Sequence, residues 1–167
     1  MSFSILQFCE QVEKRVVCLV VVTVVRPNRN SIRIKYYALR KWLLPLFLLF
    51  SQDCQFTKIH DDTALRVVFQ GNIYVGGCNL CCKRWFITFS GAECSGPLPI
   101  DAALWIRDSG EDNHRPGAIE GYCENIHKGK IRVGINIGNC PGYGNSNGNT
   151  GWNSVARLII EEVPRSQ

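Results

Sequence analysis

The sequence predicts an all-β protein with a jelly-roll-like β-sandwich fold, and three observations support this prediction. From about residue 54 onward, short runs rich in β-branched and aromatic residues alternate with clusters of Gly, Asn and Pro. The run "KIRVGINIG" (130–138) places apolar residues at alternate positions from Ile131 to Ile137, which is the period of a half-buried strand. After residue 54, no stretch of useful length has the longer apolar period of a helix.

Several further strands are expected between residue 64 and this run. The segments "ALRVVFQ" (64–70) and "NIYVG" (72–76) are predicted to be separate strands, joined by a tight turn at Gly71 and Asn72. The segment "RWFITFS" (84–90) alternates large apolar residues on its two sides. It is therefore also expected to be a strand.

The remaining strands follow the same pattern. In "AALWIRD" (102–108), Leu104 and Ile106 lie on one face and Trp105 on the other. The β-branched residues of "VARLIIEEV" (155–163) favour a strand over a helix. The Gly- and Asn-rich segment "CPGYGNSNGNTGWN" (140–153) is expected to be a flexible surface loop.

The first 53 residues have a different composition. Two apolar runs, "VVCLVVVTVV" (16–25) and "WLLPLFLLF" (42–50), each follow a pair of basic residues. Each has about half of the roughly 20 apolar residues that a spanning helix needs, and each matches the apolar part of a signal peptide. We expect residues 1–53 to be a leader-like or poorly ordered segment that acts as a signal peptide, with a signal anchor as the alternative. Residues 54–164 then form the globular domain and 165–167 a tail.

The charge pattern argues against a nucleic-acid-binding protein. The formal net charge is +5, but Lys and Arg are concentrated between residues 14 and 41, whereas acidic residues concentrate later in the chain. A nucleic-acid surface needs basic side chains on the folded face itself. We therefore expect no nucleic-acid partner.

Seven cysteines lie in the β-rich part and are the candidate disulfide residues: Cys54, Cys78, Cys81, Cys82, Cys94, Cys123 and Cys140. A structural zinc site commonly uses two Cys-x-x-Cys pairs, but this region has only the one formed by Cys78 and Cys81. A redox Cys-x-x-Cys precedes a helix, whereas this pair precedes a predicted strand. The favoured interpretation is a disulfide framework in an oxidising compartment, with zinc as the alternative.

Adjacent Cys81 and Cys82 point to opposite faces of an extended chain, so we expect them to take different partners. Because seven is an odd number, one of the thiols is either reduced or available to a second chain. The sequence leaves the pairing open.

Two long segments carry a family resemblance. They are "ALRVVFQGNIYVGGCNLCCKRWFITFSGAECSGPLPIDA" (64–102) and "TGWNSVARLIIEEVP" (150–164). Together with "CQFTKI" (54–59), they closely resemble the C-terminal globular domain of the collagen triple helix repeat-containing protein family. The likeness extends from about residue 54 to 164 and includes all seven cysteines, whereas residues 1–53 show none.

The resemblance implies a secreted protein of the extracellular matrix. It implies a domain similar to the trimeric jelly-roll heads of complement and of short-chain collagens, and therefore a homotrimer. Family members are linked to Wnt signalling, particularly its planar cell polarity branch, to restraint of collagen deposition and to cell migration. The expected partners are Wnt ligands, their receptors or collagen. The short collagen-like repeat of the family is not found in this sequence.

No group of residues predicts catalysis. Ser95, His114 and Asp101 supply the residue types of a hydrolase triad, but no nucleophile elbow or oxyanion motif accompanies them. We expect no enzyme activity, no cofactor and no metal. Membrane contact is expected only if the N-terminal segment is retained, in a form of the same domain anchored at the cell surface.

The candidate partner surface is the Gly- and Asn-rich loop. Trp152, Tyr143 and Asn153 are its candidate contact residues, because aromatic side chains anchor protein interfaces. Most of the other aromatic residues are expected to fill the core, since a small sandwich needs large side chains there.

Overall fold

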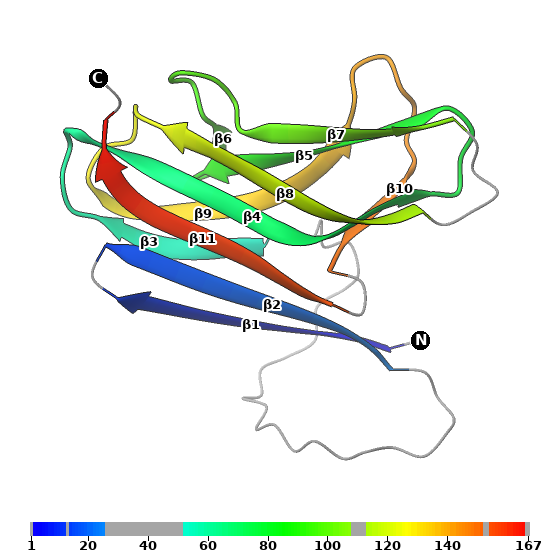
Figure 1. Ribbon diagram of the computed structural model, residues 1–167, viewed down its shortest axis with the longest axis horizontal. Helices are drawn as coiled ribbons and strands as arrows, with labels where there is room; N and C mark the ends of the chain where they lie inside the picture. The colour runs from blue at the N-terminus through cyan, green and yellow to red at the C-terminus, as the bar shows by residue number, and fades with distance from the viewer. Residues whose placement is uncertain (1, 13, 26–51, 108–112, 152–153, 166–167) are drawn as a thin grey trace.

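A computed structural model describes residues 2–12, 14–25, 52–107, 113–151 and 154–165, and it confirms the all-β prediction. Within these ranges the chain forms two antiparallel sheets stacked face to face as a β-sandwich (Figure 1). Sheet A contains β1 (Ser2–Val12), β2 (Arg15–Val25), β4 (Thr63–Gly76), β8 (Asn113–Cys123), β10 (Asn147–Thr150) and β11 (Val155–Pro164). Sheet B contains β3 (Gln52–Lys58), β5 (Cys81–Phe89), β6 (Ala92–Glu93), β7 (Asp101–Ile106) and β9 (Gly129–Asn139).

The order of the strands is that of a jelly roll. In sheet A the long strand β4 pairs with β8 on one side, and with β11 and then β10 on the other. Leaving aside β1 and the short strands β6 and β10, the sheets read β2-β11-β4-β8 and β3-β9-β5-β7. The chain crosses between the sheets at nearly every connection, which produces the interlocked Greek keys of a jelly roll.

The N-terminal hairpin completes sheet A. β1 pairs with β2, and β2 pairs with β11 from Val155 to Glu161, so the hairpin lies beside β11 in Figure 1. Sequence analysis placed these residues in a leader-like extension, and the removal of that extension stays a prediction. The apolar run at 42–50 lies outside the described residues. Across the described ranges, no helix is long and apolar enough to cross a membrane.

The predicted turn at Gly71 and Asn72 is wrong, because β4 runs without interruption from Thr63 to Gly76. A glycine is needed at position 71 for a steric reason. A Cβ atom placed on it would lie 2.9 Å from the Phe69 ring and 3.0 Å from the Cβ atom of Ala156 in β11. Glycine therefore permits the close approach of two inward-facing side chains inside a continuous strand.

The core is one apolar layer between the two sheets. Trp85, Phe56 and Ile135 of sheet B and Leu65 and Phe69 of sheet A belong to one cluster of buried side chains. Each of the five is no more than 1% exposed. Full burial of such a side chain contributes about 1.5–3 kcal/mol, so this layer supplies the main stabilisation of the sandwich.

A buried carboxylate fixes the connection between β3 and β4. Glu162 of β11 accepts hydrogen bonds from the backbone N–H groups of Ile59 and His60, at 2.9 and 2.8 Å. It also accepts one from the Thr63 hydroxyl at 2.6 Å. Burial favours a raised pKa for Glu162, but these hydrogen bonds and the nearby charge of Lys58 outweigh it and lower the pKa.

Replacement of Glu162 by Gln is expected to reduce the free energy of unfolding by about 1–3 kcal/mol at neutral pH, since hydrogen bonds to a charged group are lost. The lowered pKa means that this stabilisation is complete above the unfolded value of about 4.3 and is lost as the pH falls through the lower folded value. Denaturant unfolding of wild type and Glu162→Gln between pH 7 and pH 3 measures this difference in the free energy of unfolding. Glu120→Gln, at an exposed carboxylate, is the control and should cost less. Equal pH profiles for wild type and Glu162→Gln would contradict the assignment.

Candidate functional site

Six of the seven candidate disulfide residues form three pairs. The pairs are Cys78–Cys81, Cys82–Cys140 and Cys94–Cys123, with Cα–Cα distances of 5.9, 5.4 and 5.7 Å. These distances lie within the usual disulfide range. Cys81 and Cys82 take different partners, as the sequence predicted.

Each pair joins a different part of the sandwich. Cys94 follows β6 in sheet B and Cys123 ends β8 in sheet A, so this bond cross-links the two sheets. Cys82–Cys140 joins β5 to the residue that follows β9. Cys78–Cys81 closes the connection between β4 and β5, where Leu80 has a positive φ of 53° and is 58% exposed.

The seventh candidate, Cys54, lies apart from these pairs. Its sulfur approaches Cys18 and Cys9 of the N-terminal hairpin. Sequence analysis gave Cys9 and Cys18 no role, because an apolar run behind basic residues matched a leader. The sequence has nine cysteines in total, and this number was the signal that could have been used. It points to Cys9 and Cys18 as partners for Cys54 only if the hairpin is part of the fold.

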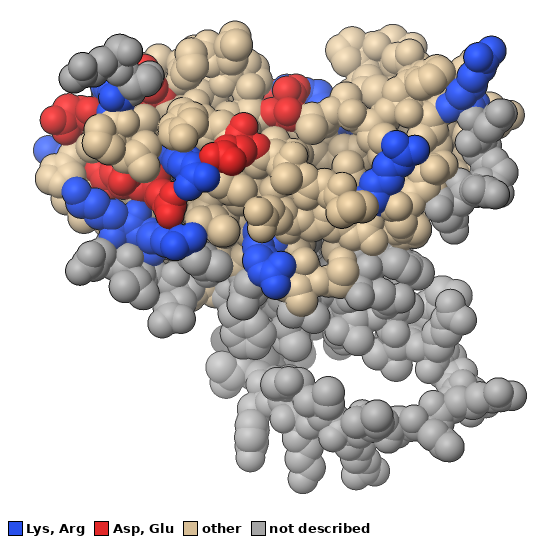
Figure 2. Space-filling view, in the orientation of Figure 1, with Lys and Arg blue, Asp and Glu red and all other residues tan. Residues whose placement is uncertain are grey.

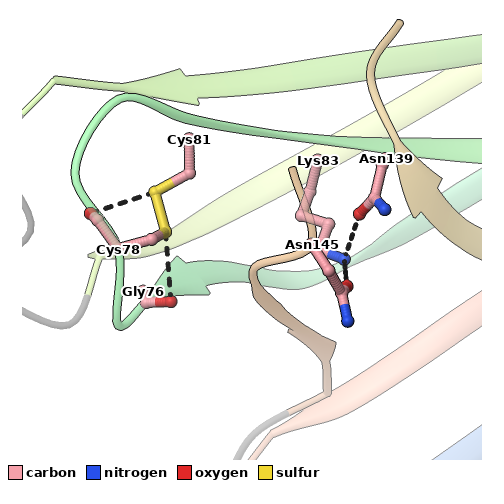
Figure 3. Close-up of a disulfide and its surroundings, with 6 residues drawn as sticks. All are labelled: Gly76, Cys78, Cys81, Lys83, Asn139 and Asn145. Atoms are coloured by element: carbon pink, nitrogen blue, oxygen red, sulfur yellow. Dashed lines mark hydrogen bonds between the residues drawn. A yellow bond between two sulfur atoms is a disulfide. The ribbon is translucent and has the colours of Figure 1, made fainter. Parts of the chain in front are cut away.

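A buried lysine holds the start of the Gly- and Asn-rich loop. Lys83 of β5 is 7% exposed, and its ammonium group donates hydrogen bonds to Asn139 Oδ1 at 2.6 Å and Asn145 Oδ1 at 3.2 Å (Figure 3). Burial lowers the pKa of Lys83. The two amide oxygens replace water around the charge, so the loop is tied to the sheet at Asn145.

Tyr143 lies in the loop segment that this lysine and the Cys82–Cys140 bond hold in place. Its backbone N–H donates to the Cys140 carbonyl at 3.1 Å, and the residue is 40% exposed. The other two candidates, Trp152 and Asn153, lie outside the described residues. Their neighbour Gly151 donates its N–H to the Asn72 carbonyl at 2.9 Å.

A shallow groove of about 530 Å³ lies next to that point, over β4, β8 and β11. Asn72, Pro116, Ser154, Val155 and Arg157 are among the residues that line it. Asn72 Oδ1 and Ser154 Oγ are buried and have no hydrogen-bond partner among the described residues. Sequence analysis missed this groove, because its residues are brought together only by the pairing of three strands.

Two exposed aromatic residues also escaped prediction. Trp105 and Tyr122 are each 49% exposed, whereas Trp85 is fully buried in the core as expected. The alternation of Trp105 with Leu104 and Ile106 was the available signal, since Ile106 is buried and Trp105 points away from the core. Sequence analysis instead assigned most of the aromatic residues to the core, because a small sandwich needs large side chains there.

A row of ion pairs crosses the outer face of sheet A. Glu161 of β11 bonds Arg15 of β2 at 3.1 Å and Arg66 of β4 at 2.6 Å, and Arg66 also bonds Glu120 of β8 at 2.6 Å. Hydrogen bonds to Glu120 and Glu161 raise the pKa of Arg66. Figure 2 shows basic and acidic side chains intermixed near the C-terminus on this face. The row connects four strands, although each exposed pair contributes little alone.

The residue types of a hydrolase triad have other partners in the structure. Asp101 accepts a hydrogen bond from Arg84, and the His114 ring stacks on Tyr74 at a centroid distance of 4.6 Å. Ser95 is exposed. These contacts give Asp101 and His114 structural roles.

A family model described as the C-terminal domain of CTHRC1 matches residues 50–160. The chain belongs to the CTHRC1 C-terminal domain family. The match to CTHRC1 includes the three disulfide pairs, Cys54 and most of the sandwich from β3 to β11. The hairpin β1–β2 precedes the matched region. Family membership and the disulfides are consistent with an extracellular location.

Disulfide removal is expected to cost more stability where the bond closes a longer loop, with a cost that grows as the logarithm of the loop length. Cys82 and Cys140 are 58 residues apart, whereas Cys78 and Cys81 are 3 apart. On the chain-entropy model, the double variant Cys82→Ala/Cys140→Ala should lose about 4 kcal/mol and Cys78→Ala/Cys81→Ala about 2 kcal/mol. Guanidinium unfolding of the two variants at one pH provides the comparison. A larger loss of stability in Cys78→Ala/Cys81→Ala than in Cys82→Ala/Cys140→Ala would contradict this disulfide pairing.

Lys83 is expected to make stability depend on alkaline pH. Because its folded pKa lies below the unfolded value of about 10.4, its charged form costs free energy at neutral pH. This cost falls as the pH rises above the folded pKa, and it is gone above the unfolded value. Wild type should therefore gain stability relative to Lys83→Met as the pH rises from neutral towards the unfolded value of about 10.4. The exposed-site variant Lys130→Met is the control, and its profile should run parallel to that of wild type.

Proposed function

We propose that this chain is a secreted, matrix-associated module without enzyme activity that binds extracellular proteins. Its activity is to modulate Wnt signalling in the planar cell polarity branch, collagen deposition and cell migration. The observation that carries the proposal is the match of residues 50–160 to the CTHRC1 C-terminal domain. The three disulfide pairs support it, because such bonds persist in oxidising compartments.

The arrangement of the loop supports a binding role. Tyr143 is presented between the Cys82–Cys140 bond and Asn145, which Lys83 holds against the sheet. A loop that is ordered before it meets its partner loses less conformational entropy on binding. An exposed tyrosine on such a loop is the type of side chain that anchors a protein interface.

The partners that fit the proposal are Wnt ligands, their receptors and collagen. In this proposal the chain acts as a homotrimer, and its resemblance to trimeric jelly-roll heads supports that state. Sizing of the purified protein with and without reductant tests this state, because it separates a trimer held by packing from one held by bonds between chains. A monomer under both conditions would remove the trimer from the proposal.

Secretion is tested with one tag ahead of Met1 and a second tag after Gln167. In animal cells, the proposal requires the C-terminal tag to accumulate in the medium. Retention of both tags in the membrane fraction would favour the form anchored at the cell surface. A stoichiometric zinc ion in the purified protein would favour the zinc-binding alternative.

Replacement of Tyr143 by Ala is expected to weaken partner binding at least tenfold, as loss of an interface anchor does. Surface plasmon resonance with fibrillar collagen, a purified Wnt ligand and a receptor ectodomain measures it. Tyr122→Ala is the matched control, because Tyr122 has comparable exposure and lies on β8, away from the loop. Wild-type binding by Tyr143→Ala, or an equal loss in both variants, would refute the role of the loop.

A further inference from the structure

Three sulfur atoms from three strands meet at one edge of the sandwich. Cys9 of β1 and Cys18 of β2 are direct partners in the strand register of sheet A. Cys54 comes from β3 in sheet B. The sulfur atoms of Cys9 and Cys54 are 3.6 Å apart, and all three sulfurs lie within 4.8 Å of one another.

Cys18 lies at bonding distance from both neighbours, yet its sulfur can form only one disulfide. The bonds Cys9–Cys18 and Cys18–Cys54 are therefore mutually exclusive. The first would close the local hairpin. The second would join β2 of sheet A to β3 of sheet B and so cross-link the two layers.

Burial and backbone spacing favour the bond between the layers. The Cα atoms of Cys18 and Cys54 are 6.2 Å apart, inside the usual disulfide range, whereas those of Cys9 and Cys18 are 4.1 Å apart, below it. Cys18 and Cys54 are 0% and 1% exposed, respectively, while Cys9 is exposed on the edge strand. An external molecule can therefore reach Cys9 more readily than the other two.

We propose that Cys9, Cys18 and Cys54 form a thiol–disulfide exchange site at which Cys9 takes up an external thiol as a mixed disulfide. In the first step, the Cys54 thiolate attacks the Cys18 sulfur of a Cys9–Cys18 bond. The Cys18–Cys54 bond forms, the Cys9–Cys18 bond breaks, and Cys9 leaves as a thiolate with no net oxidation. In the second step, the Cys9 thiolate attacks an external disulfide, forms the mixed disulfide and releases the other half as a thiolate.

The number of cysteines makes an external partner necessary. The chain has nine cysteines, and three pairs elsewhere account for six of them. Three sulfurs cannot all be joined in pairs, so a fully oxidised chain must bond a thiol from outside. That thiol comes from a second copy of this chain or from a small molecule such as glutathione. Both sources supply the same sulfur chemistry.

Peptide mapping after oxidative refolding tests the site. The full chain is refolded with reduced and oxidised glutathione, quenched with acid, alkylated and digested with trypsin without reduction. Lys14, Arg15 and the basic residues between 29 and 41 separate the three cysteines into three peptides. We expect the Cys18 peptide bonded to the Cys54 peptide. The Cys9 peptide should carry either glutathione or a second Cys9 peptide, and the two masses distinguish the sources.

Two variants complete the test. Cys54→Ser removes the attacking thiol, so Cys9–Cys18 should form and the external thiol should be lost from Cys9. Cys9→Ser, on the exposed edge strand, should keep the Cys18–Cys54 bond and carry no external thiol, and it serves if Cys54→Ser does not fold. A Cys9–Cys18 bond with glutathione on Cys54 in wild type would overturn the proposal, as would recovery of all three cysteines in reduced form.

Discussion

The shared apolar layer between the two sheets determines where the other features of the molecule lie. Trp85 and Ile135 from sheet B and Phe69 from sheet A occupy it, and strand geometry then forces alternate residues outward. This alternation exposes Trp105 on β7 and leaves Arg66 and Glu161 to form the ion-pair row on the outer face of sheet A. The cross-link Cys94–Cys123 stabilises the layer from its edge, because it joins one sheet to the other.

The sequence predicted those features that depend on local pattern. The alternate residues from Ile131 to Ile137 form the inward face of β9. The family match over residues 50–160 agrees with the resemblance that the cysteine-rich segments indicated. Features that depend on contacts distant in sequence escaped it. Gly71 was taken for a turn because its neighbour Ala156 lies 85 positions further along the chain. The pairing of residues 15–21 with β11 also escaped it, because an apolar strand and the apolar part of a signal peptide have the same composition.

Buried polar groups hold the connections at both ends of the sandwich. Glu162 fixes the chain between β3 and β4, and Lys83 fixes the start of the segment that carries Tyr143. Each is a charge surrounded by hydrogen-bonding groups from a connection, so moving that connection would leave the charge without its partners. These contacts give both connections a defined shape, including the one that is rich in Gly and Asn.

The position of the N-terminal hairpin has a consequence for the edges of sheet A. β2 pairs with β11 from Val155 to Glu161, and β4 pairs with it from Arg157 to Pro164. The residues from Arg157 to Glu161 therefore have strand partners on both sides. Detachment or proteolytic loss of the hairpin would convert β11 into an open border with a row of unsatisfied backbone groups. Such a border accepts an incoming strand from another polypeptide. Processing ahead of residue 52 would therefore change which proteins can dock by strand addition, and it would also remove Cys18 from the core and Arg15 from the ion-pair row.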